Sequence, residues 1–441
     1  MKMRFYNLRN IDALPQLANL PGDERFAMRV VAHVLPFRAN NYVLDELIDW
    51  DAAPDDPMFR LVFYHRDMLS PRQFGRVADA LRRDRPAAEL GEVVRRVRLE
   101  MNPHPSGQLT DNVPVLDEQP VPGVQHKYRE TVLVFPAKGQ TCFSYCTFCF
   151  RWAQFVNMKE LKLATDTSRR FLDYLRGQPQ VTDVLFTGGD PLVMNAASLA
   201  GYIEPLLRPE YAHLRTIRIG SKVLSFWPYR FLTDKDADDL LRLFERVVAS
   251  GKHLALMGHF NHWQELATDA VRQAIDRVLG TGAQIRVQAP LLRGINDSAD
   301  VWARLWQDQV EHGLIPYYMF VERDTGPRAY FEVPLARAWE IYRDAYARVS
   351  GLARTARGPV MSAQPGKVQV DGVTRVGGER SFQLRFLQGR DPDWVGRPFF
   401  ARYDPRATWL TDLRPAFGER RFFYEADVVM ARRASVAGRR G

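Results

Sequence analysis

The chain has 441 residues, 46% of them hydrophobic, and a formal net charge of +9. This length and composition allow a large buried core, which excludes a disordered protein. No apolar run reaches the roughly 20 residues of a membrane-spanning helix, and the N-terminus lacks the apolar core of a signal peptide. The three cysteines cannot all pair in disulfides, which favours a reducing compartment. We therefore expect a cytoplasmic protein with no membrane partner.

The positive charge by itself would suggest a nucleic-acid partner. The arginines are scattered, however, and form a dense basic segment only in the tail, at Arg432, Arg433, Arg439 and Arg440. A short basic tail is more often a solvated chain end than a binding arm. We therefore expect no nucleic-acid partner, and the alternative of an RNA-binding protein would require salt-sensitive binding.

Sequence patterns divide the chain into three regions. Residues 1–125 carry apolar residues at three- and four-residue spacing, which predicts a helical N-terminal region that ends in an extended connector rich in Pro, Gly and Asn. In residues 126–350, short apolar runs alternate with amphipathic helices in about six units, which is typical of parallel βα units. Residues 351–441 mix strands and loops. The predicted fold class is α/β, a partial (βα)6 barrel with a helical N-terminal region and a mixed C-terminal extension.

All three cysteines of the chain lie in the run TCFSYCTFCFRW, as Cys142, Cys146 and Cys149. Soft thiolates at this spacing can bind one face of a four-iron, four-sulfur cluster, and three ligands leave one iron open. An open iron is what S-adenosylmethionine needs in order to chelate the cluster before it is cleaved to a radical. The alternative is a zinc site completed by histidine, but the motif contains no histidine and its spacing suits zinc poorly.

Polar residues follow three predicted strands at their carboxyl ends, where βα loops build binding sites. Each group alone could be an ordinary turn, but together they favour one site. We expect them to bind the cofactor; they are Gly188, Gly189 and Asp190, then Arg218 and Ser221, then His259, Asn261 and His262.

Over most of residues 36–370 the sequence resembles the lysine 2,3-aminomutase family of radical S-adenosylmethionine enzymes. The matching segments are NPHPSGQL, GVQHKYRETVLVF, TCFSYCTFCFR, FTGGDPL, IRIGSKV, HFNH, VQAPLLRGIND, IPYYMF and PGK. The resemblance implies a radical-SAM-type barrel and an isomerase that uses pyridoxal phosphate beside the cluster. Such an enzyme moves the α-amino group of an amino acid to its β-carbon after a 5'-deoxyadenosyl radical has removed a β-hydrogen.

The resemblance also assigns roles to single residues. Lys367 takes the place of the lysine that holds pyridoxal phosphate, and Tyr128 falls among the cofactor-binding positions. Arg151 matches the arginine that clamps the substrate carboxylate, a role that suits the two parallel donors of a guanidinium. Gln288 matches a position close to the substrate.

Two departures concern the cofactor. The segment before Lys367 is SAQPGK, with one glycine where the family has several, and Thr131 stands where the family tends to have an arginine near the phosphate. These departures keep open an alternative enzyme of the same family that works without pyridoxal phosphate and consumes S-adenosylmethionine as an oxidant.

Two further departures concern the substrate. Members that act on lysine hold its distal ammonium with two aspartates, and this chain has Arg323 and Val360 at those positions. An unpaired buried ammonium would cost several kcal/mol, so lysine is not the expected substrate. Arg323 predicts an anionic or hydrogen-bond-accepting side chain, as in a glutamate-like amino acid. Asp324 is adjacent, and a slip of one residue would exchange the two.

The resemblance further implies an electron donor of the flavodoxin or ferredoxin kind and a homo-oligomer. One branch of the family modifies a lysine of a protein partner, but we favour a free amino acid as the small-molecule substrate. Lysine-acting members can bind zinc through extra cysteines near the C-terminus. This chain has none there, so we expect no zinc.

Overall fold

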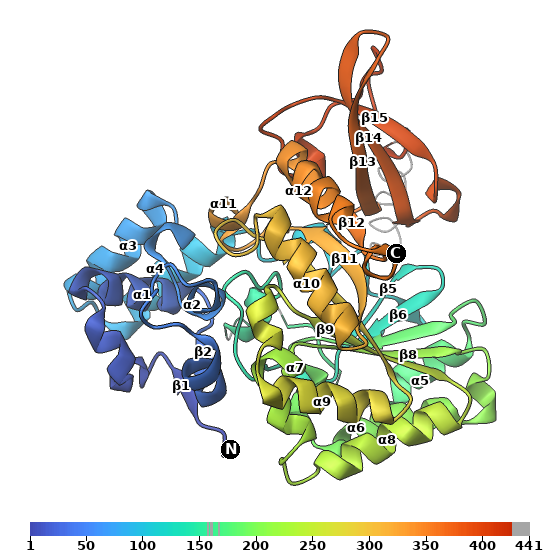
Figure 1. The fold of residues 1–441 in the computed structure, drawn as a ribbon, viewed down its shortest axis with the longest axis horizontal. Helices are drawn as coiled ribbons and strands as arrows, with labels where there is room; N and C mark the ends of the chain where they lie inside the picture. Colours follow the sequence, from blue (N-terminus) through green and yellow to red (C-terminus); the bar gives the residue numbers. More distant parts are fainter. Residues whose placement is uncertain (157, 159–161, 166–167, 426–441) are drawn as a thin grey trace.

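The computed structural model describes residues 1–156, 158, 162–165 and 168–425. The basic tail predicted at Arg432, Arg433, Arg439 and Arg440 lies outside the described residues. In Figure 1 the N-terminal region lies at one side of a large sheet, and the C-terminal strands extend from another side.

The N-terminal region is mainly helical. The third of its helices begins at a capping box, in which Ser70 accepts from the Gln73 backbone and the Gln73 side chain accepts from Ser70. This arrangement satisfies amides that the first turn would leave unpaired. A short hairpin forms within the connector. The elements are β1 (Phe5–Asn7), α1 (Gly22–Val34), β2 (Arg38–Asn40), α2 (Pro57–Val62), α3 (Pro71–Arg82), α4 (Ala87–Glu100), β3 (Val115–Leu116) and β4 (Gln119–Pro120).

One sheet of 11 strands runs through the rest of the molecule, in the order β15 to β5. Neighbouring strands from β6 to β12 are parallel, whereas β5 and β13 to β15 are antiparallel to their neighbours. The strands are β5 (Val124–Tyr128), β6 (Thr131–Val134), β7 (Asp183–Phe186), β8 (Thr216–Ser221), β9 (His253–His259), β10 (Gln284–Leu291), β11 (Ile315–Val321), β12 (Arg357–Ser362), β13 (Gly366–Val376), β14 (Glu379–Gly389) and β15 (Pro398–Arg402).

Each strand from β6 to β11 is followed by at least one helix before the next strand begins. These repeated βα units confirm the predicted α/β class. The parallel sheet continues past residue 350, because β12 pairs with β11 and leads into β13. The helices are α5 (Arg169–Arg176), α6 (Ala196–Ile203), α7 (Val223–Phe226), α8 (Ala237–Ala249), α9 (Asp269–Gly280), α10 (Ala299–Glu311), α11 (Arg328–Phe331) and α12 (Leu335–Ala347).

The two faces of the sheet differ. Along β10, Ile285 and Val287 are buried, whereas Arg286 and Gln288, which alternate with them, are only half-buried. Residues that alternate in this way point to opposite faces of a strand. The helices α8, α9 and α10 contact the strands β9, β10 and β11 in turn, so the apolar side chains face the helices and the polar ones face inward.

The sheet is curled. Lys127 of β5 donates a hydrogen bond through its Nζ to the carbonyl oxygen of Ala363, directly after β12. These strands are seven spacings apart in the sheet order, which would be about 34 Å in a flat sheet. Among the described residues the end strands β5 and β15 do not pair with each other, so the sheet stays open.

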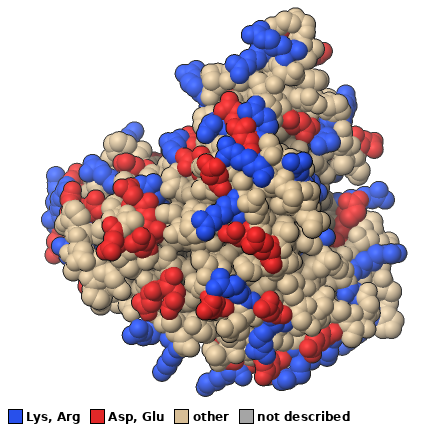
Figure 2. Space-filling model, in the orientation of Figure 1, with Lys and Arg blue, Asp and Glu red and all other residues tan. Residues whose placement is uncertain are grey.

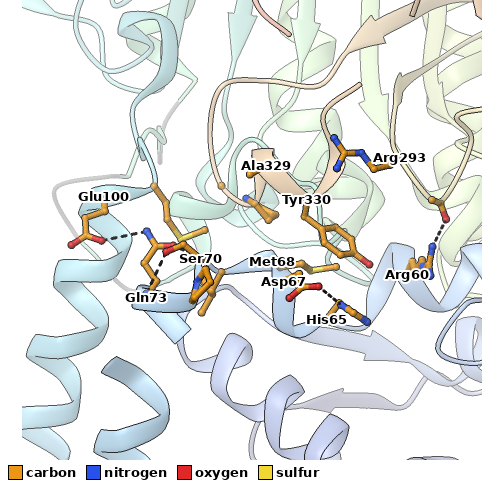
Figure 3. A pocket seen from close by; sticks show the side chains of 16 residues that line it. Arg60, His65, Asp67, Met68, Ser70, Gln73, Glu100, Arg293, Ala329 and Tyr330 are labelled. Atoms are coloured by element: carbon orange, nitrogen blue, oxygen red, sulfur yellow. Dashed lines mark hydrogen bonds and ion pairs between the residues drawn. The ribbon is translucent and has the colours of Figure 1, made fainter. Parts of the chain in front are cut away.

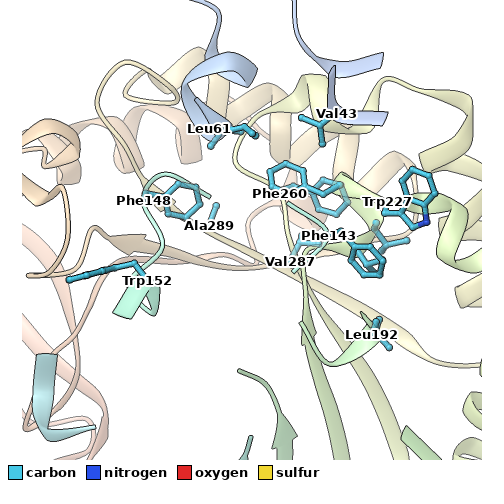
Figure 4. Close-up of a cluster of buried hydrophobic side chains, with 14 of the residues drawn as sticks. Val43, Leu61, Phe143, Phe148, Trp152, Leu192, Trp227, Phe260, Val287 and Ala289 are labelled. Carbon is cyan, nitrogen blue, oxygen red and sulfur yellow. The ribbon is translucent and has the colours of Figure 1, made fainter. Parts of the chain in front are cut away.

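The hydrophobic core joins the N-terminal region to the sheet. Figure 4 shows Phe143 and Phe148 beside side chains of the N-terminal region and of the sheet. Val43 and Leu61 come from the N-terminal region, and Ala289 comes from β10. The N-terminal region therefore packs directly over the segment that contains the cysteines.

A second, smaller core lies between β13, β14 and the segments that follow them, around Phe386 and Trp394. On the face shown in Figure 2, lysines and arginines are interspersed with aspartates and glutamates. None of the helices in the described ranges is long and apolar enough to cross a membrane.

Candidate functional site

The cysteine loop follows β6, and its backbone is held by the N-terminal region. Arg38 Nη1 donates to the carbonyl oxygen of Cys142 at 3.1 Å. Asn40 is fully buried, and its Nδ2 donates to the carbonyl oxygens of Phe143 at 3.1 Å and Phe226 at 2.8 Å. These bonds fix the loop at the carboxyl edge of the parallel strands.

The thiols of Cys142, Cys146 and Cys149 are half-buried and form no disulfide. Burial raises the pKa of each thiol, that of Cys149 to about 11, and the charges of Asp190 and of the other two thiols raise the pKa of Cys142 further. Three adjacent thiolates need a cationic centre to be stable, which the iron of a cluster supplies. The three cysteines therefore fit the predicted cluster. Within the described ranges, no three His, Cys, Asp or Glu side chains converge as ligands of a single ion do.

The predicted glycine turn after β7 packs against the start of the cysteine loop. A Cβ on Gly189 would lie 2.4 Å from the Thr141 carbonyl oxygen, and one on Gly188 would lie 2.1 Å from the Gln140 side chain. The Asp190 amide donates to the same Thr141 oxygen at 2.7 Å. Glycine is thus required at position 189 by the close approach of the Thr141 backbone, and at position 188 by a φ of +140°, which side chains rarely allow.

Asp190 and Ser221 meet at the ends of β7 and β8. Ser221 Oγ donates to the Asp190 carboxylate at 2.7 Å, and the Leu192 and Lys222 amides donate to it at 3.0 Å. Burial raises the pKa of Asp190 to about 6. Both side chains were predicted to bind the cofactor; in the structure they bind each other and join two strand ends.

Arg218 lies on the inner face of β8 and forms a two-pronged ion pair with Asp183 of β7. Thr131 Oγ1 donates to Asp183 Oδ2 at 3.0 Å, the oxygen that also accepts from Arg218 Nη2. Asp183 was not singled out from the sequence. Asp183 gives Arg218 an acidic partner. Both residues lie close to Lys367, and the charges of both affect the pKa of Lys367.

The end of β9 carries the remaining predicted cofactor residues. Gln288 Nε2 lies 3.1 Å from His259 Nε2. An amide nitrogen can only donate, so this hydrogen bond requires a neutral ring with its proton on Nδ1. Burial lowers the pKa of His259 to about 3, which keeps the ring neutral. Asn261 and His262 are buried in the turn that follows. Their backbone amides donate to the buried carboxylate of Glu265, which was also not singled out from the sequence.

Lys367 lies at the start of β13, where it is paired with Ser362 of β12. Its Nζ lies 5.0 Å from the ring centre of Tyr318 and 5.5 Å from that of Tyr128, and it donates to Gln388 Oε1 at 2.7 Å. Burial, followed by the charges of Arg218 and Arg357, lowers the pKa of Lys367 to about 7. Such a lysine is a neutral amine in a substantial fraction of molecules at neutral pH.

Arg151 and Arg323 come together although 172 positions separate them in the sequence. Their guanidinium carbons lie 5.0 Å and 4.8 Å from the ring centre of Phe150. Burial and the charge of Arg323 lower the pKa of Arg151 to about 9. Among the described residues neither guanidinium has an ion-pair partner, and Arg323 donates only to Ser106 Oγ, at 3.0 Å.

The other two predicted substrate residues are placed differently. The Asp324 backbone oxygen accepts from Asn102, so the residue is tied to the N-terminal region. Val360 is fully buried and paired with Gln369, two residues after Lys367. Since cross-strand partners share a face, Val360 and Lys367 lie on the same side of the sheet.

Lys127 and Arg357 are further basic residues near Lys367 that were not singled out from the sequence. Burial, followed by the charges of Arg390, Arg323 and Lys367, lowers the pKa of Lys127. Arg357 Cζ lies 4.4 Å from the ring centre of Tyr318. The alternation of apolar and polar residues along the strands is the sequence signal that could have predicted these polar residues on the inner face.

A groove of about 650 Å³ lies between the N-terminal region and the loops after β10 and β11. None of the predicted site residues lines it. Figure 3 shows that its side chains pair among themselves, as His65 does with Asp67 at 3.9 Å and Gln73 with Glu100 at 3.3 Å. We therefore place the site on the inner face of the sheet and not in this groove.

The fold is thus an α/β sheet of βα units, with a cysteine loop at its carboxyl edge and a buried lysine inside. No protein-family model matches the chain. A putative L-lysine 2,3-aminomutase of Aquifex aeolicus is 32% identical over 413 residues, which cover 93% of this chain and 96% of that protein. The chain therefore belongs to the lysine 2,3-aminomutase family.

Other relatives match a shorter part. The L-lysine 2,3-aminomutase of Clostridium subterminale is 30% identical over 57% of this chain and 57% of its own length. That of Bacillus subtilis is 27% identical over 79% of this chain and 63% of its own. Among solved structures, SuiB of Streptococcus suis has a TM-score of 0.37 at 13% identity, covering 65% of this chain and 59% of its own.

Proposed function

We propose that the protein is a radical S-adenosylmethionine enzyme that uses pyridoxal phosphate and moves the α-amino group of a free amino acid to its β-carbon. The observation that carries this proposal is the arrangement of Lys367 and the Arg151–Arg323 pair around a curled sheet with the cysteine loop at its edge. Family membership adds to it, since the named relatives are lysine 2,3-aminomutases. The six βα units would form the partial barrel of such an enzyme.

In this proposal Cys142, Cys146 and Cys149 hold the cluster, which together with S-adenosylmethionine supplies the radical. Pyridoxal phosphate, when bound, gives the migrating nitrogen a route through its π-system. Lys367 suits such a cofactor because a neutral amine is the form that attacks a carbonyl carbon. The basic side chains of Lys127 and Arg357 would favour a phosphate nearby.

For the substrate we propose an amino acid with an acidic side chain. Arg151 would bind the α-carboxylate, and Arg323, which also contacts the Phe150 ring, would bind the distal acid. Two buried guanidinium groups that repel each other are stabilised by two anions. A distal ammonium would find two arginines there and no acidic partner in ion-pair contact with either.

The test is an anaerobic incubation of the reconstituted protein with a panel of free amino acids and analysis for β-isomers. We expect β-glutamate or the isomer of a similar acidic amino acid, and no product from lysine. Turnover of lysine alone would overturn the substrate assignment.

Borohydride reduction after loading with pyridoxal phosphate, followed by peptide mapping, tests the cofactor. A label on Lys367 is expected, and the Lys367→Met variant is the control. Failure of the protein to bind pyridoxal phosphate would favour a family member that consumes S-adenosylmethionine as an oxidant.

The remaining partners are also proposals. The cluster would be reduced by a small electron-transfer protein of the flavodoxin or ferredoxin kind, and the chain would form a homo-oligomer. A lysine on a partner protein as the substrate would be revealed by inactivity on the whole panel together with modification of that partner.

A further inference from the structure

Glu265 is a buried carboxylate at the edge where the cysteine loop lies, in the helical turn Trp263–Leu266 after β9. It is fully buried, and donors from two segments of the chain fill both of its oxygens. Oε1 accepts from Lys222 Nζ and Ser225 Oγ. Oε2 accepts from the backbone amides of Asn261 and His262, the latter at 2.9 Å.

The ion pair between Glu265 and Lys222 is almost sealed from water, since the Lys222 side chain is 12% exposed and that of Glu265 0%. Lys222 Nζ donates further to the His259 carbonyl oxygen at 3.2 Å and to Asn261 Oδ1 at 2.9 Å. The loss of one member of such a pair leaves the other charged and buried. Glu265 therefore determines where Lys222 lies.

Lys222 in turn determines the orientation of the Asn261 amide. An ammonium has only donors, so the side chain must present its oxygen to Lys222 and turn Nδ2 away. The Asn261 backbone is fixed at both ends, because its amide donates to Glu265 and its carbonyl accepts from Asn296 Nδ2 at 2.9 Å. Rotation of the amide would bring two sets of donors face to face.

Asn261 Nδ2, held in this way, has no hydrogen-bond partner among the described residues, although it is buried. A buried donor without an acceptor costs more than an ordinary hydrogen bond contributes. The position lies beside the cluster site, since the charges of Lys222 and Glu265 both affect the Cys146 thiol. An acceptor on a ligand at this edge would satisfy the amide.

We propose that Glu265 is a positioning residue that acts through Lys222 to present Asn261 Nδ2 to an acceptor atom of S-adenosylmethionine. The inference rests on the proposed function for the identity of the cofactor. Glu265 and Lys222 do not themselves contact the cofactor in this arrangement; Asn261 does.

The test measures the Kd of S-adenosylmethionine by equilibrium dialysis with the anaerobically reconstituted full-length protein. Asn261→Asp keeps the oxygen that faces Lys222 but removes the free donor, and Glu265→Gln removes the charge that holds Lys222. Both variants are expected to raise the Kd at least about tenfold. Both should also weaken the change that S-adenosylmethionine causes in the electron paramagnetic resonance spectrum of the reduced cluster.

The control is Asp371→Asn, which breaks the ion pair of Asp371 on β13 with Arg385 on β14 at 3.2 Å. It should lower the melting temperature and leave the Kd within about twofold of that of the wild type. If Glu265→Gln does not fold, Lys222→Met tests the same positioning of Asn261.

Binding to Asn261→Asp with the wild-type Kd and spectral change would overturn the inference and leave the proposed function standing. Weak binding to Asn261→Asp but normal binding to Glu265→Gln or Lys222→Met would overturn the positioning role. A wild-type protein that holds the cluster but does not bind S-adenosylmethionine would overturn both proposals.

Discussion

Basic side chains surround Lys367 on the inner face of the sheet. Arg218 has Asp183 as its acidic partner. Lys127 and Arg357, by contrast, form no ion pair among the described residues. Like charges this close raise the free energy of the folded protein unless anions share the site. The basic side chains around Lys367 therefore support the proposal of a phosphate and of a substrate with two carboxylates.

The pKa of Lys367 should rise when the positive charge of Arg357 is removed. Its pKa of about 7 is set by burial first and then by Arg218 and Arg357. The neutral form gains population as pH rises through the pKa, so capture of pyridoxal phosphate should increase through neutral pH. In Arg357→Gln the midpoint should move upward by about one pH unit. An absorbance titration of cofactor binding against pH measures this midpoint, and an unchanged midpoint would contradict the role of Arg357.

The pocket around Arg323 and Val360 should determine which amino acid is accepted. Replacing both by aspartate, in Arg323→Asp with Val360→Asp, restores the pair that lysine-acting members use. The variant should lose activity on the acidic substrate by at least about 100-fold and gain detectable turnover of lysine. The single variant Val360→Ala, which changes size and adds no charge, serves as the control. If the double variant kept the original specificity, the side chain of the substrate would not bind near residues 323 and 360.

Among the elements, the cysteine loop depends on β2 of the N-terminal region. Asn40 on this strand supplies two hydrogen bonds across the molecule. The motif TCFSYCTFCFRW predicts which residues would hold a cluster, because it is local in sequence. The hydrogen bonds to Asn40 could not be predicted, since Phe143 lies 103 positions away and no pattern relates the two.

Asn40→Ala should loosen this loop. The buried carbonyl oxygens of Phe143 and Phe226 would lose their donor, at a cost of about 1–3 kcal/mol each. We expect a lower melting temperature and a lower iron content after reconstitution. Asn195→Ala removes the cap of α6, which costs about 1 kcal/mol, and should leave the iron content unchanged. Equal iron content in the two variants would show that the hydrogen bonds from Asn40 are not needed for cluster binding.

For the whole molecule, the alternation of apolar runs and amphipathic helices was sufficient to predict the α/β class. This pattern did not predict the curl of the sheet, because the curl depends on contacts between distant residues, such as that of Lys127 with Ala363. For the same reason, the sequence placed Arg323 near the substrate by resemblance but did not reveal that Arg151 and Arg323 both contact the ring of Phe150.

The bond between Lys127 and Ala363 has a consequence for how the protein is made. A ribosome releases the N-terminal region and the cysteine loop long before β12 and β13, and N-terminal parts begin to fold first. The half of the site that binds iron is thus complete while the amine of Lys367 has not yet been synthesised. The last strands therefore close the inner face late in synthesis. Only this closure brings Lys367 to the same face as the cysteine loop.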